Sequence, residues 1–256
     1  HKVMQTLGDK KVAMNKGLDI VEDEETGKNL TLEECDDLKL LNDIAFDYYT
    51  EAFPEVNITD ADRRTCLRWA EKAVAYKDGM FDPRNQDVHA TELFFDIEID
   101  KPWAKYKYLV GDEVIEGNLS IKGTVDLIID NGNNFYEILD YKTGKRINWA
   151  TGEEKTYDKL QKDTQLLLSV SIYYINDGGV FSMVFDDNDY YKAENILRKK
   201  FEYIRDVEHP KLLSKNNSHW KCQKLCRFSS PYKEGADRSI CQYLSDYVKQ
   251  RRRKNC

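Results

Sequence analysis

The sequence predicts an α/β fold in which a mixed central sheet is flanked by helices and preceded by a helical N-terminal part. Two observations support this prediction. Apolar residues recur at helical spacing between residues 38 and 76, whereas residues 88–141 contain alternating or β-branched runs typical of strands. We expect three parts: a helical part at 1–85, a sheet-containing core at 86–207 and a cysteine-containing segment at 208–256.

The N-terminal part contains two predicted helices. Thr31 and Glu34 have the spacing of a capping box, and helical spacing follows from residue 38 to Phe53-Pro54. A second helix is predicted from about Thr59 to about Tyr76. Residues 8–29 are polar and acidic, which indicates a solvated loop.

The core begins with strands. Residues 88–99 alternate in polarity and are predicted to form a strand, and residues 103–117 are predicted to form a long hairpin arm. The clearest signal is a second hairpin, in which residues 124–130 and 135–141 are apolar and the intervening 131–134 (Asn-Gly-Asn-Asn) has turn chemistry.

The rest of the core is predicted from shorter signals. A helix is expected at 157–175, with Gln161 and Gln165 on one face, followed by a short edge strand at 180–185. A last helix is expected to begin at Asn188 and to run to about residue 207.

Three charged residues interrupt the apolar hairpin. Asp140 and Lys142 are two residues apart on one strand, so their side chains leave the same face. Asp126, on the other strand, joins them only if the loop has an odd number of residues or a bulge intervenes; a three-residue loop at 131–133 satisfies this condition. Two carboxylates are suitable ligands for Mg²⁺ or Mn²⁺, and a neighbouring lysine adds positive charge. The competing interpretation is a structural ion pair in an ordinary strand pair.

Composition excludes some classes of protein. The 256 residues carry a formal net charge of −7, which argues against a generally basic DNA-coating protein but not against a local DNA-binding strip. No apolar run is long enough to span a bilayer and no signal peptide is visible, so a cytoplasmic location is expected. In that context the six cysteines are expected to be reduced thiols or metal ligands.

The hairpin motif points to a known family. Gly123-x-x-Asp126, an apolar run, a turn and then Ile-Leu-Asp140-Tyr-Lys142-Thr-Gly resembles the PD-(D/E)xK nuclease superfamily, specifically its RecB/AddB-like branch. In that branch a helix carrying a glutamine follows, and Gln165 matches it; the family often has a tyrosine four residues later, where this chain has Ser169.

The resemblance implies a restriction-endonuclease-like fold and a role for each matched residue. Asp126 and Asp140 would bind the catalytic Mg²⁺ or Mn²⁺, with the backbone carbonyl of Tyr141 as a further ligand. Lys142 would assist the attack on the phosphate, and Gln165 would contact the substrate or support the site.

Two further residues have alternative interpretations. In the RecB-like branch a helix carrying a metal-binding histidine precedes the strands, and His1-Lys-Val-Met-Gln-Thr-Leu7 resembles the back half of that helix; the alternative is a residue left from a tag. Glu92 is expected to be a solvent-facing strand charge, and the alternative is an accessory acid beside the site.

The C-terminal cysteines resemble a metal clip. Some RecB/AddB-like nucleases carry a [4Fe–4S] cluster, which implies cluster binding by Cys222, Cys226 and Cys241. The fourth ligand would lie before His1 or be one of three other cysteines: Cys35, Cys66 or Cys256. Zinc is the second possibility, and unliganded thiols are the third.

Together these patterns predict a metal-dependent DNA nuclease. We expect an exonuclease in recombination, repair or phage DNA processing, encoded by a bacterium or phage, with DNA as substrate and a helicase or recombination protein as a possible partner. The alternatives are a catalytically silent DNA-end-binding module and a nuclease domain of a helicase–nuclease.

Overall fold

The structure is a computed structural model, and it describes residues 1–133, 135–147, 153–156, 171–177, 179–182 and 187–206. The chain divides into two compact units, His1–Arg205 and Asp206–Cys256, and the elements below belong to the first apart from the last residue of α5. The helices and strands of that unit, in chain order, are α1 (Lys2–Asn15), β1 (Ile20–Asp23), β2 (Lys28–Thr31), α2 (Leu38–Ala52), α3 (Asp60–Ala75), β3 (Val88–Glu98), β4 (Lys105–Val110), β5 (Glu113–Asn118), β6 (Ser120–Asp130), β7 (Tyr136–Lys142), β8 (Ser171–Tyr174), β9 (Gly179–Ser182) and α5 (Asp187–Asp206).

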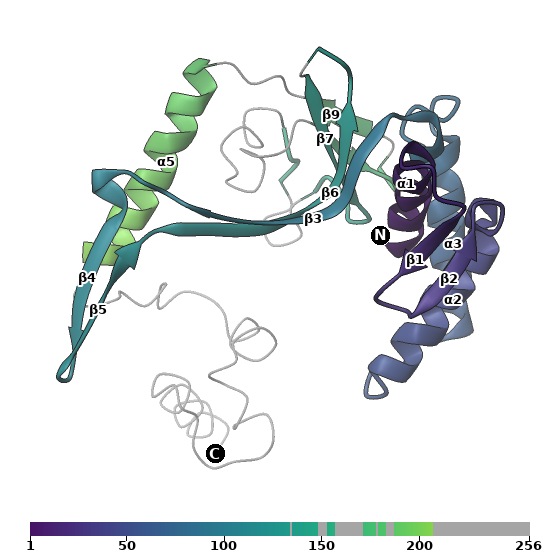
Figure 1. Cartoon of the computed structure of the whole chain (residues 1–256), viewed down its shortest axis with the longest axis horizontal. Coiled ribbons are helices and arrows are strands. Elements are labelled where there is room, and N and C mark those ends of the chain that lie inside the picture. The colour runs from purple at the N-terminus through teal and green to yellow at the C-terminus, as the bar shows by residue number, and fades with distance from the viewer. Residues whose placement is uncertain (134, 148–152, 157–170, 178, 183–186, 207–256) are drawn as a thin grey trace, which may run out of the picture. The chain divides into compact units, whose positions relative to one another are not determined.

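The central sheet has five strands in the order β3-β6-β7-β8-β9. Strands β7 and β8 are parallel, and the other neighbouring pairs are antiparallel, so the sheet is mixed. The predicted α/β fold with a mixed central sheet and N-terminal helices is confirmed, and Figure 1 shows helices α1, α2 and α3 grouped at one end of this sheet.

The β6–β7 hairpin has the predicted strands but a longer loop. Asp130 pairs with Tyr136, so the loop contains the five residues 131–135 rather than the three residues considered from the sequence. Gly132 and Asn133 have φ angles of 78° and 55°, the left-handed region that glycine and asparagine tolerate best. Five is also an odd number, so the expected side-chain parity is kept.

The alternating residues of the hairpin separate a core face from a polar face. Leu127, Leu139 and Tyr141 are at most 2% exposed and belong to the main apolar cluster with Leu7 of α1 and Tyr173 of β8. Burying such side chains contributes roughly 1.5–3 kcal/mol each. Because side chains alternate along a strand, the residues between them leave the other face of the sheet.

The segment after Leu7 differs from the expected loop. Helix α1 continues to Asn15, and β1 and β2 pair around a turn in which Gly27 has a φ of 68°, so the prediction of a solvated loop at 8–29 is wrong. Gly8 does not end the helix. A Cβ at this position would lie 2.5 Å from Thr91 Cγ2 and 2.9 Å from Leu127 Cδ1, so the glycine permits α1 to pack closely on β3 and β6.

The hydrogen bonds of the predicted capping box at Thr31 are present, but they do not cap α2. Thr31 and Glu34 exchange the expected hydrogen bonds around a 3₁₀ turn at Glu34–Asp36. Helix α2 starts afterwards, where the side chain of Asp37 accepts hydrogen bonds from the backbone N–H groups of Lys39 and Leu40. Helix α3 begins as predicted, with Thr59 as N-cap in a capping box.

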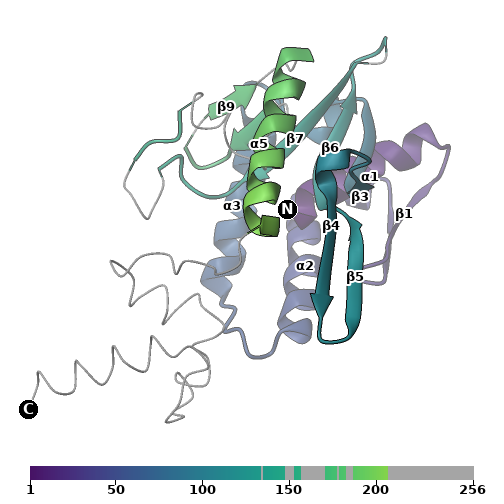
Figure 2. The same ribbon diagram turned by 90° about the vertical axis from the view of Figure 1, so that its left-hand side faces the viewer.

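Strands β3 and β6 continue beyond the sheet into an arm formed by β4 and β5, which confirms the predicted hairpin arm. Helix α5 lies beside this arm in both Figure 1 and Figure 2. The contact is specific: the Trp103 ring meets the Phe201 ring edge-on at 6.4 Å, and Arg205 donates a hydrogen bond to the Trp103 carbonyl. The helix starts at Asp187, one residue before the predicted cap Asn188.

Strand β8 corrects another prediction. Residues 171–174 form a fully buried strand paired in parallel with β7, so they do not extend the helix predicted at 157–175. A short apolar run reads equally well as a buried strand or a buried helix turn, which explains the error. Residues 157–170 lie outside the described part of the chain. Strand β9 is the sheet edge, as predicted for that segment.

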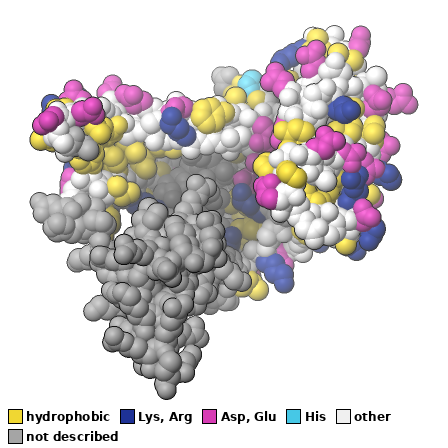
Figure 3. Space-filling view, turned by 90° about the horizontal axis from the view of Figure 1, so that it is seen from below, with side chains coloured by type: hydrophobic (Ala, Val, Ile, Leu, Met, Phe, Trp, Pro, Cys, Tyr) yellow, Lys and Arg dark blue, Asp and Glu magenta, His cyan; other side chains and the backbone are white. Residues whose placement is uncertain are grey.

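Figure 3 shows apolar side chains on the arm, and on the N-terminal elements it shows acidic and basic side chains interspersed with one another. Among the described residues, every helix is too short or too polar to cross a membrane.

Candidate active site

Three acidic residues occupy one row across three neighbouring strands. The β6–β7 register pairs Leu127 with Leu139, and one further step places Asp126 opposite Asp140. The β3–β6 register pairs Thr91 with Leu127 and Leu93 with Val125, which places Glu92 opposite Asp126. The row Glu92–Asp126–Asp140 therefore crosses β3, β6 and β7.

Helix α1 adds a histidine to this row. His1 is the N-cap of α1, and its Nδ1 lies 3.3 Å from Asp126 Oδ2. One ligand atom from each of His1, Glu92 and Asp126 falls within 4.8 Å of the others, a spacing at which a single metal ion could be bound by all three. The hydrogen bond with Asp126 raises the pKa of His1 above its ordinary value.

Asp126 is held at the centre of the site. Its Oδ2 accepts a hydrogen bond of 2.9 Å from the backbone N–H of Tyr141, which is just beyond the last paired residues of β6 and β7. Burial favours the neutral acid, but the hydrogen bonds from His1 and from Tyr141 outweigh it and lower the pKa of Asp126. The carboxylate is therefore ionised at neutral pH and correctly charged to bind a cation.

Asp140 and Lys142 form the second half of the site. Lys142 Nζ lies 2.8 Å from Asp140 Oδ1, and the two side chains are 39% and 20% exposed. The other oxygen, Asp140 Oδ2, is buried and has no hydrogen-bond partner among the described residues. Burial raises the pKa of Asp140, and the ion pair with Lys142 offsets only part of this effect. A divalent cation bound at Oδ2 would satisfy this oxygen, so the residues present fit a metal.

Glu92 was expected to be a solvent-facing strand charge, and in the structure it lies beside His1 and Asp126. Its φ angle is 42°, which is unusual for a residue other than glycine in a strand, and its side chain is only partly exposed. Burial and the nearby charge of Asp126 raise the pKa of Glu92. Such strained backbone positions persist where the surrounding structure holds them, and they cluster at functional sites.

Tyr141 contributes to the core with its side chain. Its ring is 2% exposed, and its hydroxyl donates a hydrogen bond of 2.9 Å to the backbone carbonyl of Phe81. The side chain of Tyr141 therefore belongs to the core, and its backbone N–H is the group that contacts Asp126.

Several predicted residues lie outside the described part of the chain: Gln161, Gln165, Ser169, Cys222, Cys226, Cys241 and Cys256. Two of the other candidate cysteines are described, and both are free thiols. Cys35 is fully buried in the apolar cluster, and burial raises its pKa to about 11. Cys66 lies on α3, where burial also raises the pKa of its thiol.

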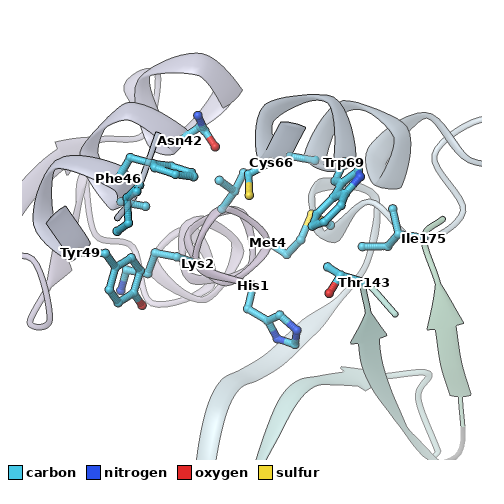
Figure 4. A pocket seen from close by; sticks show the side chains of 14 residues that line it. His1, Lys2, Met4, Asn42, Phe46, Tyr49, Cys66, Trp69, Thr143 and Ile175 are labelled. Atoms are coloured by element: carbon cyan, nitrogen blue, oxygen red, sulfur yellow. The ribbon is translucent and has the colours of Figure 1, made fainter. Parts of the chain in front are cut away.

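A pocket of about 410 Å³ adjoins this site. We call it the helical pocket, and it is lined by His1, Lys2, Val3, Met4, Asn42, Ala45, Phe46, Tyr49, Ile58, Cys66, Trp69, Ala70, Thr143 and Ile175. Figure 4 shows Phe46 and Tyr49 on one side of α1 and Cys66 and Trp69 on the other. His1 and Thr143 bring the pocket to the end of β7 where Lys142 lies.

Comparison with known proteins identifies the family of the chain. No curated protein and no solved structure matches the sequence. A family profile does match, over residues 1–230, and it describes the PD-(D/E)XK nuclease superfamily. The match covers most of the chain and contains every residue of the acidic row, His1 and Lys142. The chain is thus a member of the PD-(D/E)XK nuclease superfamily.

Proposed function

We propose that this chain hydrolyses phosphodiester bonds of DNA with the help of Mg²⁺ or Mn²⁺ bound by His1, Asp126 and Asp140. Membership of a nuclease superfamily supports this proposal. One observation carries it. Asp140 Oδ2 is buried and has no hydrogen-bond partner among the described residues, and a cluster of ligand atoms from His1, Glu92 and Asp126 lies in the same row. Purely structural carboxylates would be expected to have hydrogen-bond partners.

The oxygen-rich ligand set favours a hard divalent cation. We propose that Glu92 and the backbone carbonyl of Tyr141 complete the set. A cation held there would acidify a water molecule and stabilise negative charge on the phosphoryl oxygens. The alternative of a structural ion pair provides a partner for Asp140 Oδ1 but not for Asp140 Oδ2.

Lys142 contributes through its position and charge. Its ammonium group is held 2.8 Å from Asp140 and remains partly exposed, so it is fixed at the edge of the site and accessible to substrate. A positive charge at this point would stabilise the additional negative charge that a phosphate gains during attack by water. Removing this charge should therefore weaken binding of the transition state more than it destabilises the fold.

We also propose that the enzyme is an exonuclease that acts in recombination, repair or phage DNA processing, with a helicase or recombination protein as partner. The likeness of the motif around Asp126 and Lys142 to the RecB/AddB-like branch supports this narrower function, and Gln165 would contact the DNA. The competing proposal is a silent module that binds DNA ends, which the same residues would permit if no cation binds.

The test uses end-labelled linear DNA and closed circular DNA, each incubated with Mg²⁺, Mn²⁺ or EDTA. We expect metal-dependent loss of linear DNA only, and loss of activity by at least a factor of 100 in Lys142→Ala. The matched control is Lys145→Ala, which removes an exposed lysine three residues away and should retain activity.

Each result has a distinct meaning. Cleavage of circular DNA would reassign the enzyme as an endonuclease. Binding of DNA without cleavage under any condition would support the silent module instead. Equal activity of Lys142→Ala and wild type would refute the assignment of the site.

The cysteines Cys222, Cys226 and Cys241 support a separate proposal, a bound [4Fe–4S] cluster with zinc as the alternative. Protein purified without oxygen should then contain about four iron atoms and absorb at about 400 nm. Stoichiometric zinc without iron would favour the alternative, and absence of both metals would refute each.

A further inference from the structure

We infer that an unpaired DNA strand lies along α3 and places one base in the helical pocket, beside the candidate active site. The inference rests on the proposed function, since it assumes that the substrate is DNA. It adds a binding site and a preference for unpaired nucleotides that neither the family match nor the acidic row implies.

The first observation is a row of basic side chains on α3. Arg64, Arg68 and Lys72 are spaced four residues apart, so they follow one another along one side of the helix, and all three are exposed. We call them the α3 basic row. Each step rises about 6 Å along the helix axis, which suits successive phosphates of an extended strand.

Charge neutralisation within the protein does not explain the row. Among the described residues, no carboxylate forms an ion pair with Arg64, Arg68 or Lys72, although Glu71 lies beside Lys72 in sequence. The neighbouring Arg63 is different, because its guanidinium lies 3.1 Å from Asp43 and 2.6 Å from Asp47. The row therefore has positive charge available for an anionic partner, whereas Arg63 has a structural role.

The second observation is the direction in which the row runs. Lys72 Nζ donates a hydrogen bond to the backbone carbonyl of Asn176, and Asn176 Nδ2 donates one of 2.7 Å to the carbonyl of Thr143. Thr143 directly follows Lys142. The C-terminal end of the basic row is therefore linked, through two hydrogen bonds, to the strand end that carries the candidate catalytic lysine.

The third observation is the character of the helical pocket. Its volume of about 410 Å³ lies within the range of small-ligand sites, and aromatic side chains of Phe46, Tyr49 and Trp69 line it. Trp69 and Cys66 come from the same helix as the basic row, and His1 and Thr143 reach the pocket from the candidate active site. The basic row leaves α3 on a different side from Cys66 and Trp69. The two surfaces meet near Lys72, which bonds to Asn176, the residue after Ile175 of the pocket. A flat aromatic ligand joined to an anionic backbone that passes this point matches both.

A nucleobase is such a ligand, and stacking on aromatic side chains is the usual way in which proteins bind single strands. A base inside a duplex is paired and stacked, so it would first have to leave the helix. The arrangement therefore favours a strand that is already unpaired, such as a frayed or single-stranded end.

The test measures binding without cleavage, with Ca²⁺ in place of Mg²⁺. The probe is a short oligodeoxythymidylate that contains a single 2-aminopurine, a base whose fluorescence falls when it stacks. The label is placed at each position in turn. We expect quenching at one position only, and no quenching with a duplex of the same length. Trp69→Leu should remove the quenching and lower the affinity about tenfold.

Two further variants separate the pocket from the fold. Cys66→Phe fills the pocket without removing an aromatic residue, and it should remove the quenching while leaving the salt dependence of binding unchanged. Tyr48→Leu is the control for aromatic loss, because Tyr48 lies on α2 beside Tyr49 but does not line the pocket. Circular dichroism verifies that each variant is folded.

The basic row is tested by its salt dependence. Neutralising two residues, Arg64→Gln with Arg68→Gln, should reduce the slope of log affinity against log salt by about 1.4, or about 0.7 for each lost phosphate contact. The matched control neutralises Lys16, which follows the C-terminal end of α1, and Lys28, which is the first residue of β2.

Equal salt slopes in the two double variants would overturn the inference, as would 2-aminopurine fluorescence that stays unchanged at every position. The proposed nuclease function fails separately. If the wild type binds the oligonucleotide in this way but does not cleave DNA with Mg²⁺ or Mn²⁺, the binding site stands and the enzyme activity does not.

Discussion

Replacing Gly8 with alanine tests how the packing of α1 supports the site. Two effects oppose each other. Alanine favours a helix interior over glycine by about 0.8–1.0 kcal/mol, so an exposed helix would be stabilised. At this position the new Cβ would lie 2.5 Å from Thr91 Cγ2 and 2.9 Å from Leu127 Cδ1, and both distances require a shift.

The packing effect should win, because neither neighbour can move easily. Leu127 is 1% exposed, and the Thr91 hydroxyl donates a hydrogen bond to Asp9 of α1. Overpacking of this kind costs about 1–3 kcal/mol, which leaves a net loss of about 1 kcal/mol after the gain in helix propensity. For a chain of this size we expect the Tm to fall by about 2–4 °C.

The same shift should reach the active site, because α1 carries His1 at its N-terminus. A displacement of the helix away from β3 and β6 separates His1 from Asp126. We therefore expect cleavage to slow by about tenfold, which is less than the loss of about 100-fold that a displacement of 1 Å can cause. Thermal unfolding and a cleavage assay measure the two effects on the same protein.

A second substitution provides the control. Thr91→Ser removes the methyl group nearest to the new Cβ and keeps the hydroxyl that bonds to Asp9. In the double variant, Gly8→Ala with Thr91→Ser, part of the lost stability should return, and the double-mutant cycle gives the coupling energy. A Gly8→Ala protein more stable than wild type would show that the close contact between α1 and the sheet is wrong.

Four other predictions concern the site and the elements that support it. Mn²⁺ at 100 times its Kd should stabilise the wild type by about 2.7 kcal/mol, and Asp140→Asn should lose most of this gain in a thermal shift assay. A metal binds the neutral imidazole, and the pKa of His1 is raised, so Mn²⁺ affinity measured by calorimetry should fall as the pH drops through a value above 6.5; His1→Gln should remove this step. In the metal-free protein the raised pKa of His1 has the opposite consequence: its stabilising contribution is complete below pH 6.5 and is lost as the pH rises. Thr59→Ala removes the cap of α3 and should cost about 1 kcal/mol in urea unfolding, with little effect on the metal.

Local patterns in the sequence were sufficient to predict the central hairpin. Turn residues at 131–134 separate two apolar runs, and the i, i+2 spacing of Asp140 and Lys142 fixes their common face whatever the rest of the chain does. The hairpin motif supplied only the condition that the loop be odd, and the observed loop of five residues meets it, so Asp126 lies opposite Asp140. Parity depends only on whether the loop is odd or even, which makes it a more robust prediction than the exact turn.

The long α1 was missed for a physical reason. Gly8 is followed by Asp9 and two lysines, which reads as the start of a polar loop in a single sequence. The glycine is needed because α1 lies so close to Thr91 and Leu127 that a methyl group does not fit. Such a requirement comes from residues more than eighty positions away, and no local pattern records it.

Glu92 shows the same limit at the site itself. Its position opposite Asp126 depends on the β3–β6 register, and the strands are separated in sequence by the whole β4–β5 arm, so no turn sets that register. The register also shifts near Val88, and Glu92 has a φ of 42°, outside the range of a regular strand. A simple alternation along β3 therefore cannot say which face this residue takes. The proximity of the lysine and the two aspartates could be predicted because a short hairpin joins them, whereas Glu92 becomes a candidate site residue only through the long-range pairing of the folded sheet.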